Sequence, residues 1–277
     1  MESSSILGGG ILALVLVAGG LVSSTFHLAN PKNAWRAFFR FKTSWLSREG
    51  VFAVLFFPFA LLYLLGVWVS EGSNALVALF GVIAVVLAIL TVFATGMIYA
   101  CLKTIRQWNT ALTPTNYLLL GLATGAVLLV MVLLISGKSA ALVAGMAALL
   151  LVLAGVAKAV YYYWLQTVTG PTLKTATGFT RAQVRLLDTG HTAGTFLTDE
   201  FGYQVDDRLR TSLKLLVFIF GILLPLLMMA AVASGVGGTL SGVLAALSAL
   251  VGVGVERWLF FAEARHVVNL YHGAQHT

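Results

Sequence analysis

Residues 75–100, ALVALFGVIAVVLAILTVFATGMIYA, contain no charged side chain. A helix needs about 20 such residues to cross roughly 30 Å of bilayer hydrocarbon. Six more apolar runs of comparable length occur, at about 6–26, 48–69, 116–136, 140–165, 211–233 and 238–262. We expect helices, because an open strand would leave its backbone groups unpaired in lipid. The sequence therefore predicts an all-α, polytopic integral membrane bundle of about seven transmembrane helices, with residues 1–277 in a single membrane domain.

Composition agrees with a membrane location and narrows the choice of cofactors. Hydrophobic residues make up 59% of the chain and charged residues 10%, against about 25% in soluble domains. The single cysteine, Cys101, excludes a disulfide framework and cannot alone hold an iron–sulfur cluster or a structural zinc. The histidines lie at helix ends or in loops: His27, His191, His266, His272 and His276. Neither a haem held between two histidines inside the bundle nor a metal site is therefore expected.

The first apolar run is predicted to be a retained helix and not a secretory signal. Its leader, MESSS, has no positive charge, and no cleavage site of the A-x-A type precedes His27.

Charge placement predicts the orientation. Thirteen of the 17 Lys and Arg residues lie in the loops at 27–48, 101–115 and 166–214, whereas the alternate loops at 70–74, 137–139 and 234–237 carry Lys138 alone. Positive loops face the cytoplasm. The N-terminus is therefore expected outside, and the first loop, the long fifth-to-sixth loop and the C-terminus in the cytoplasm. Topology explains the formal charge of +7, so nucleic acid is not implied.

The loop between the first two runs, SSTFHLANPKNAWRAFFRFKTSWLSREG at 23–50, is basic and aromatic. We call residues 27–48 the hinge. His27 is its first residue, and Glu49 directly follows its last. A histidine and a carboxylate can hydrogen-bond a quinone oxygen and exchange its protons. Each also has a structural interpretation. His27 could simply be a residue at the membrane interface. Glu49 could complement the positive end of a helix dipole at a helix N-terminus that Ser47 caps.

Three ionisable residues lie inside predicted helices. Lys158 is near enough to a helix end to extend to the cytoplasmic headgroups, which is the simplest interpretation. Glu256 and Arg257 are expected to face the bundle interior, because facing lipid costs each of them a few kcal/mol. Structural pairing there and a role at a ligand site both remain open.

The hinge motifs HLANPKNAWRA and SWLSRE resemble those of the membrane-anchor (DmsC) subunits of dimethyl sulfoxide reductase-type molybdoenzymes. Similar segments occur at 97–125, 172–188 and 254–264. The resemblance implies a haem-free anchor in the bacterial cytoplasmic (inner) membrane, which exchanges electrons between the quinone pool and a four-cluster iron–sulfur subunit wired to a molybdopterin subunit. By motif position, the family's quinone-binding histidine and glutamate correspond to His27 and Glu49.

Two departures from that family pattern matter. The motif follows the first of seven helices here and the second of eight in the family, which predicts that an N-terminal helix is missing. The cytoplasmic orientation resembles the branch that serves cytoplasmic sulfite-oxidising enzymes, in which electrons run from substrate to quinone.

The predicted function is therefore electron exchange between an iron–sulfur partner and ubiquinone or menaquinone, with substrate catalysis in other subunits. The candidate quinone-binding residues are His27, Arg48, Glu49, Lys158, Glu256 and Arg257. The candidate docking residues are Trp35, Arg36, Arg40, Lys42 and Trp45, together with loop 166–210; the hinge charges are alternatively topology determinants or ligands of anionic headgroups. The alternatives are an anchor of an S- or N-oxide reductase that uses menaquinol, a small-solute or ion transporter, and a structural anchor without its own quinone site.

Overall fold

The computed structural model describes residues 3–26, 30–70, 74–179, 181–188 and 205–277, and the chain there is helical, with two isolated β-bridges. Within these ranges seven helical spans are long and apolar enough to cross a membrane. They are α1 (Ser3–Thr25), α2 (Trp45–Val69), α3 (Ala75–Ala100), α4 (Leu112–Ile135), α5 (Ala141–Thr167), the continuous stretch from α8 (Asp207–Phe218) to α9 (Leu224–Ala233), and α10 (Thr239–Ala262). The predicted all-α, multi-pass membrane bundle is confirmed.

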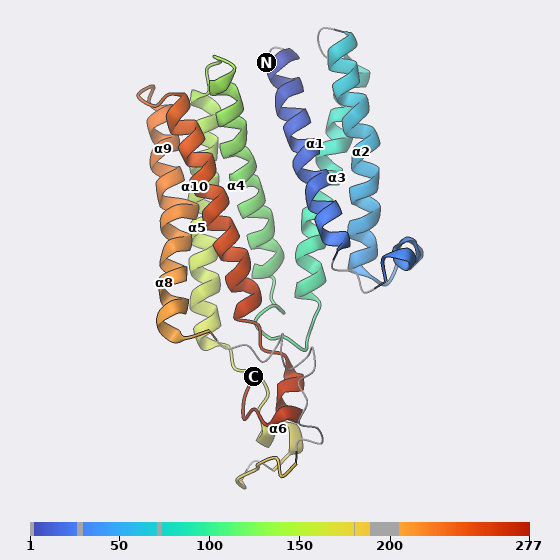
Figure 1. Cartoon of the computed structure of the whole chain (residues 1–277), viewed down its shortest axis with the longest axis vertical. Coiled ribbons are helices and arrows are strands. Elements are labelled where there is room, and N and C mark those ends of the chain that lie inside the picture. The colour runs from blue at the N-terminus through green and yellow to red at the C-terminus, as the bar shows by residue number, and fades with distance from the viewer. Residues whose placement is uncertain (1–2, 27–29, 71–73, 180, 189–204) are drawn as a thin grey trace.

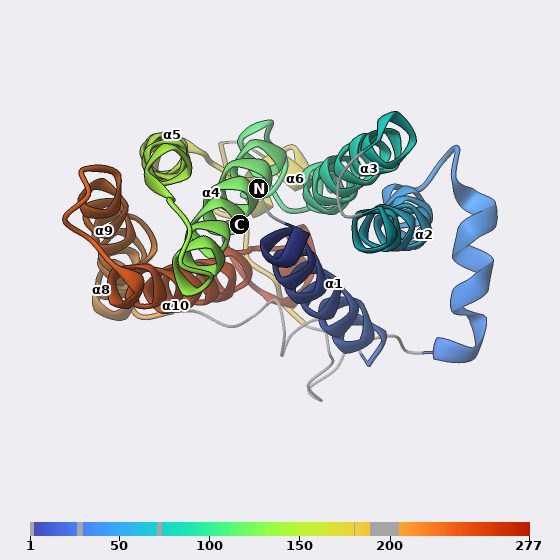
Figure 2. The same cartoon turned by 90° about the horizontal axis from the view of Figure 1, so that it is seen from above.

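The spans fall into two groups (Figures 1 and 2). Helices α2 and α3 form an antiparallel pair, while α4, α5, α8–α9 and α10 form a bundle, and α1 packs against α2 and α4. Small residues let the helices of that bundle approach closely. Its buried core consists largely of Val127, Val130, Ala144, Ala147, Leu151, Met229, Ala245 and Ala246.

A short π-helix, Ile219–Leu223 (η2), joins α8 to α9. Pro225 follows it, and because proline has no N–H it frees a carbonyl in the preceding turn. The Ser248 hydroxyl of α10 donates to the Phe220 carbonyl (2.7 Å). Here α10 crosses so closely that a Cβ on Gly252 would lie 2.2 Å from the Gly221 Cα. This glycine contact lies one turn before Glu256 and so holds that part of α10 against its neighbours.

The hinge contains a 3-10 helix, η1 (Pro31–Arg40), which lies across the long axis of the spans and is the blue ribbon at the right of Figure 2. Helix α2 begins at Trp45, with Ser44 as its N-cap, so the predicted cap at Ser47 is wrong. Ser47 is instead buried, and its hydroxyl donates to the Ala37 carbonyl of η1. This bond ties the hinge to the start of α2.

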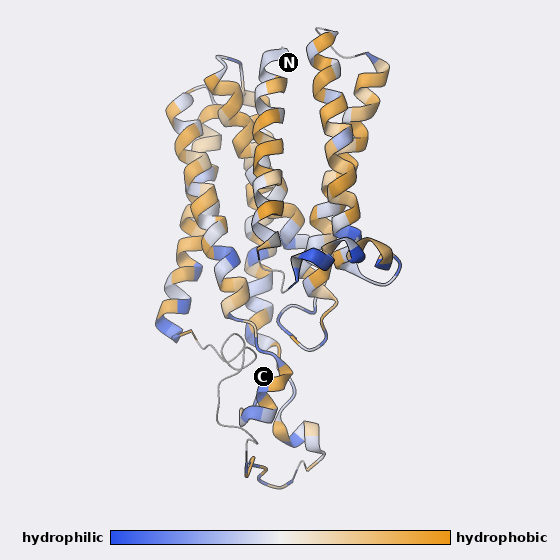
Figure 3. Ribbon diagram, turned by 45° about the vertical axis from the view of Figure 1, so that its right-hand side comes forward, coloured by the Kyte–Doolittle hydropathy of each residue, from blue (hydrophilic) through white to orange (hydrophobic). Residues whose placement is uncertain are grey.

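The basic connections gather at one end of the bundle. The hinge, the α3–α4 loop, α6 (Leu173–Thr177) and the C-terminal 3-10 helix η3 (Val267–His272) all lie at the lower end in Figure 1, and hydrophilic residues concentrate there in Figure 3. The bridge from Ile105 to His266 joins two of these segments. The sequence predicts that these alternate connections lie on the same side of the membrane, and the structure places them at one end of the bundle. That this side is the cytoplasmic one stays a prediction.

Candidate functional site

A cavity of about 720 Å³ opens between the hinge, the lower half of α1 and the facing sides of α2 and α3. Most of its wall is apolar. Its polar and aromatic side chains come from α1, η1, α2 and α3: Ser24, Trp35, Phe38, Ser47, Glu49, Thr91, Thr95 and Tyr99. Such a cavity suits a ligand with a polar, planar head and an apolar body.

Glu49 is the charged group of this cavity, and Thr95 is its hydrogen-bond partner. The Thr95 Oγ1 lies 2.5 Å from a Glu49 carboxyl oxygen and 2.9 Å from the Thr91 carbonyl. A hydroxyl has one proton to donate but can also accept. An ionised Glu49 accepts from Thr95, whereas a protonated Glu49 donates to Thr95, which then donates to Thr91. The contact therefore accommodates Glu49 both before and after proton transfer.

The other predicted hinge residues divide between the cavity and its surroundings. His27 lies outside the described residues. Trp35 lines the cavity beside Glu49. Arg48 does not; its guanidinium lies 4.2 Å from the Trp45 ring and donates to the Phe41 carbonyl (3.0 Å) and the Lys42 carbonyl (2.8 Å). Arg48 thus holds the end of the hinge onto α2.

Four of the five predicted docking side chains are exposed at the hinge surface, and the fifth, Trp45, is partly buried. Arg36, Arg40 and Lys42 are exposed. The Arg36 guanidinium lies 5.7 Å from the Trp35 ring, and Trp45 packs edge-on against Phe93 of α3.

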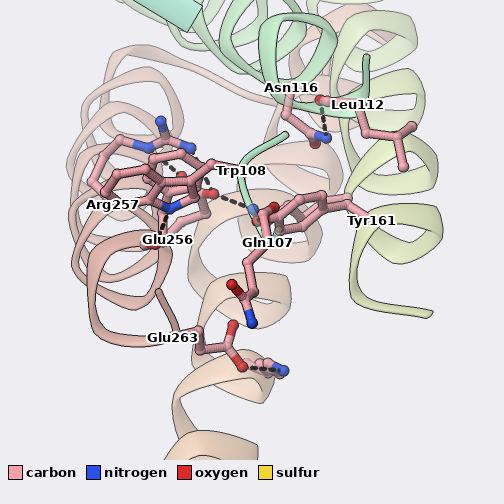
Figure 4. Close-up of polar contacts among 11 residues, drawn as sticks. Gln107, Trp108, Leu112, Asn116, Tyr161, Glu256, Arg257 and Glu263 are labelled. Carbon is pink, nitrogen blue, oxygen red and sulfur yellow. Dashed lines mark hydrogen bonds and ion pairs between the residues drawn. The ribbon is translucent and has the colours of Figure 1, made fainter. Parts of the chain in front are cut away.

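Lys158, Glu256 and Arg257 come together in a second cluster, between α5 and α10. Figure 4 shows Glu256 and Arg257 side by side. The Lys158 ammonium forms an ion pair with Glu256, and both residues are at most 1% exposed. Arg257 donates to the same carboxylate through Nε (2.5 Å) and Nη2 (2.7 Å). The interpretation of Lys158 as a residue that extends to the headgroups is wrong, because its ammonium stays inside the bundle. Glu256 and Arg257 pair inside the bundle, which agrees with the structural alternative, and a role for them at a ligand site stays a hypothesis.

Aromatic rings surround both cations. The Lys158 ammonium lies 4.3 Å from the Tyr161 ring and 4.8 Å from the Tyr162 ring, and the Arg257 guanidinium lies 4.1 Å from the Tyr117 ring. These contacts stabilise cations that have lost water. Two cations share one carboxylate here, and the buried Nη1 of Arg257 has no hydrogen-bond partner among the described residues.

A tyrosine pair connects the cluster to the cavity. Tyr99 lines the cavity and stacks on Tyr117 (ring centroids 5.9 Å apart, 17° between planes), and Arg257 covers Tyr117. A Cβ on Gly96 would lie 2.6 Å from the Pro114 Cα, so α3 and α4 are close at this level. The sequence reasoning missed Thr95 and Tyr99. Thr91, Thr95 and Tyr99 follow one another at intervals of four residues and so share one face of an apolar helix. This pattern is the signal in the sequence that indicates them.

Comparisons with known proteins agree on the family. The family model described as "DMSO reductase anchor subunit (DmsC)" matches residues 1–262. The chain is also 33% identical over 282 residues to a sulfite dehydrogenase subunit of Allochromatium vinosum, an alignment that covers 95% of this chain and 85% of that protein. No solved structure shows significant similarity to the chain.

Proposed function

The chain belongs to the DMSO reductase anchor subunit family, and we propose that it exchanges electrons between its partner oxidoreductase and membrane quinone at the cavity beside Glu49. As a member of this family it is a multi-pass membrane-anchor subunit of an oxidoreductase. The quinone, ubiquinone or menaquinone, accepts two electrons and two protons when it is reduced. The partners are an iron–sulfur subunit with four clusters and a molybdopterin subunit that carries the substrate site.

The observation that carries this proposal is the composition of the cavity. A quinone ring needs hydrogen-bonding groups at its oxygens and flat or apolar walls at its faces. Glu49 and Thr95 supply the hydrogen bonds, and Trp35 and Tyr99 supply aromatic surface. Because the Glu49–Thr95 hydrogen bond can form with the carboxyl either ionised or protonated, Glu49 can pass a proton between the ring oxygen and water.

The name of the relative supports a direction of electron flow. The similar protein belongs, by its name, to a sulfite dehydrogenase. We propose that this chain likewise serves a complex that oxidises a sulfite-type substrate and reduces quinone, on the cytoplasmic side of the bacterial inner membrane. The exposed hinge cations Arg36, Arg40 and Lys42 and the segment 166–210 would contact the partner.

The test uses the intact complex, purified through a tag on this chain. The copurifying chains should include a subunit with four iron–sulfur clusters, and the complex should reduce quinone with the physiological substrate. Thr95→Val removes the partner of Glu49 and is expected to lower quinone reduction by about tenfold or more. Electron transfer from substrate to a soluble dye should be unchanged.

The matched control is Thr115→Val. The Thr115 hydroxyl donates to the Ala111 carbonyl at the start of α4 (2.9 Å), and Thr115 is exposed and does not line the Glu49 cavity. Equal quinone activity in the two variants would count against the Glu49 cavity as the quinone site. A complex without a cluster-bearing partner would count against the function itself.

A further inference from the structure

A second hollow, of about 800 Å³, adjoins the Glu49 cavity, and Val17 of α1 lines both. Side chains of α1, α2, α3 and α4 form its wall. Apart from Tyr63, whose ring packs on Gly81, every lining residue is apolar or glycine. We call this hollow the apolar groove.

Small residues keep the groove open. Its wall includes Gly10 and Ala13 of α1, Ala60 of α2, Ala78, Gly81, Ala84 and Ala88 of α3, and Gly121 and Gly125 of α4. A Cβ on Gly125 would meet no atom within 4 Å, so the space in front of this residue is free.

We propose that the groove holds the polyprenyl tail of the quinone whose ring occupies the Glu49 cavity. This inference rests on the proposed function and adds the binding mode of the substrate. The lining on α3 runs from Ala88 to Ala78, about 15 Å at 1.5 Å per residue, or half of the roughly 30 Å hydrocarbon thickness. The path therefore starts near the middle of α3, next to the polar cavity, and continues toward the opposite end of the spans.

Continuity with the polar cavity favours a tail over a separate phospholipid chain. A ligand that spans both hollows needs a head that hydrogen-bonds Glu49 and Thr95 and a single apolar chain, which is the layout of a membrane quinone. The anionic phosphate of a phospholipid would instead lie against the Glu49 carboxylate, and like charges repel. Because lipid is as apolar as the groove, burial there contributes little affinity by the hydrophobic effect. The groove instead orients the tail, so blocking it should weaken binding of long-tailed quinones selectively.

The test introduces bulk into the groove of the intact complex. Gly125→Leu places a side chain in the free space on α4, and Ala88→Leu does so from α3, at the end near Glu49. Each is expected to raise the KM for a long-tailed quinone by about fivefold or more, the size of a typical overpacking effect. The KM for a tail-less quinone should not change.

The control is Gly145→Leu, on an exposed position of α5 where a Cβ also meets nothing within 4 Å. It should leave both KM values unchanged. The inference is overturned if both groove variants behave like the control, or if they raise the KM equally for both quinones. If the inference fails, the proposed function still stands provided that the parent complex reduces a tail-less quinone and Thr95→Val loses that activity. If the parent complex reduces no quinone at all, the proposed function and the inference both fail.

Discussion

Lys158 and Glu256, 98 residues apart in the sequence, form an ion pair that is buried between α5 and α10. Glu256 also binds Arg257, so one carboxylate neutralises two cations. The two members of the pair are therefore not equivalent. Removing the carboxylate leaves two unpaired cations, whereas removing the ammonium leaves Glu256 with Arg257.

This asymmetry predicts an order of stability. Glu256→Gln should destabilise the fold by about 3 to 5 kcal/mol, the usual result of breaking a buried pair, and Lys158→Met should cost clearly less. The thermal unfolding of the detergent-solubilised protein measures both. Glu263→Gln is the control, because Glu263 pairs with Lys214 (2.5 Å) at the end of α10, where water compensates part of the loss. Equal losses in Glu256→Gln and Lys158→Met would contradict the shared-carboxylate geometry.

The orientation can be tested with topology reporters. A reporter fused after residue 45 or 190 should indicate the cytoplasm, and one fused near residue 72 the outer side, because the basic loops share one end of the bundle. The reverse pattern would favour an exported complex over a cytoplasmic one.

The same placement predicts electroneutral turnover. The Glu49 cavity lies at the end of the bundle that carries the basic loops, so electrons need not cross the bilayer and protons exchange with the partner's side. In proteoliposomes with the whole complex, substrate-driven quinone reduction should leave a potential-sensitive dye unchanged. A sustained potential would show that charge crosses the bundle.

The sequence predicted the spans well because each depends only on local composition and length. The predicted start of the second span, at residue 48, is three residues late. The polar residues Arg48 and Glu49 look like the start of a helix, but Ser44 provides the cap and α2 begins at Trp45. Long-range pairing was harder. Nothing in the sequence around Lys158 identifies Glu256 as its partner, or the reverse. The stacking of Tyr99 on Tyr117 depends on how closely α3 and α4 approach. Those contacts require the folded arrangement.

Acid should open the C-terminal helix η3. The His266 Nδ1 accepts a hydrogen bond from the Val268 N–H (3.0 Å), which needs an unprotonated nitrogen, and burial lowers the pKa of His266 below its usual 6.5. The opened segment then binds a proton more readily than the folded one, so stability is lost as the pH falls below about 6.5. Hydrogen exchange at Val268, corrected for its intrinsic pH dependence, should rise between about pH 7 and pH 5. In His266→Asn the side-chain oxygen keeps the bond without titrating, and an acid-induced rise there would refute the assignment.

The remaining test concerns His27 and Glu49, the two residues at the ends of the hinge segment on which the proposed quinone site depends. If His27 hydrogen-bonds a quinone oxygen and exchanges its proton, His27→Ala should strongly reduce quinone-coupled activity, while the complex stays assembled and dye-linked activity is retained. Glu49→Gln should impair the same step more mildly, because the amide still hydrogen-bonds Thr95 but cannot pass a proton. In the double variant the losses should be less than additive, since both groups act on one ligand. Fully additive losses would place His27 and Glu49 at separate steps, and loss of the partner from the membrane in His27→Ala would instead assign the hinge to assembly.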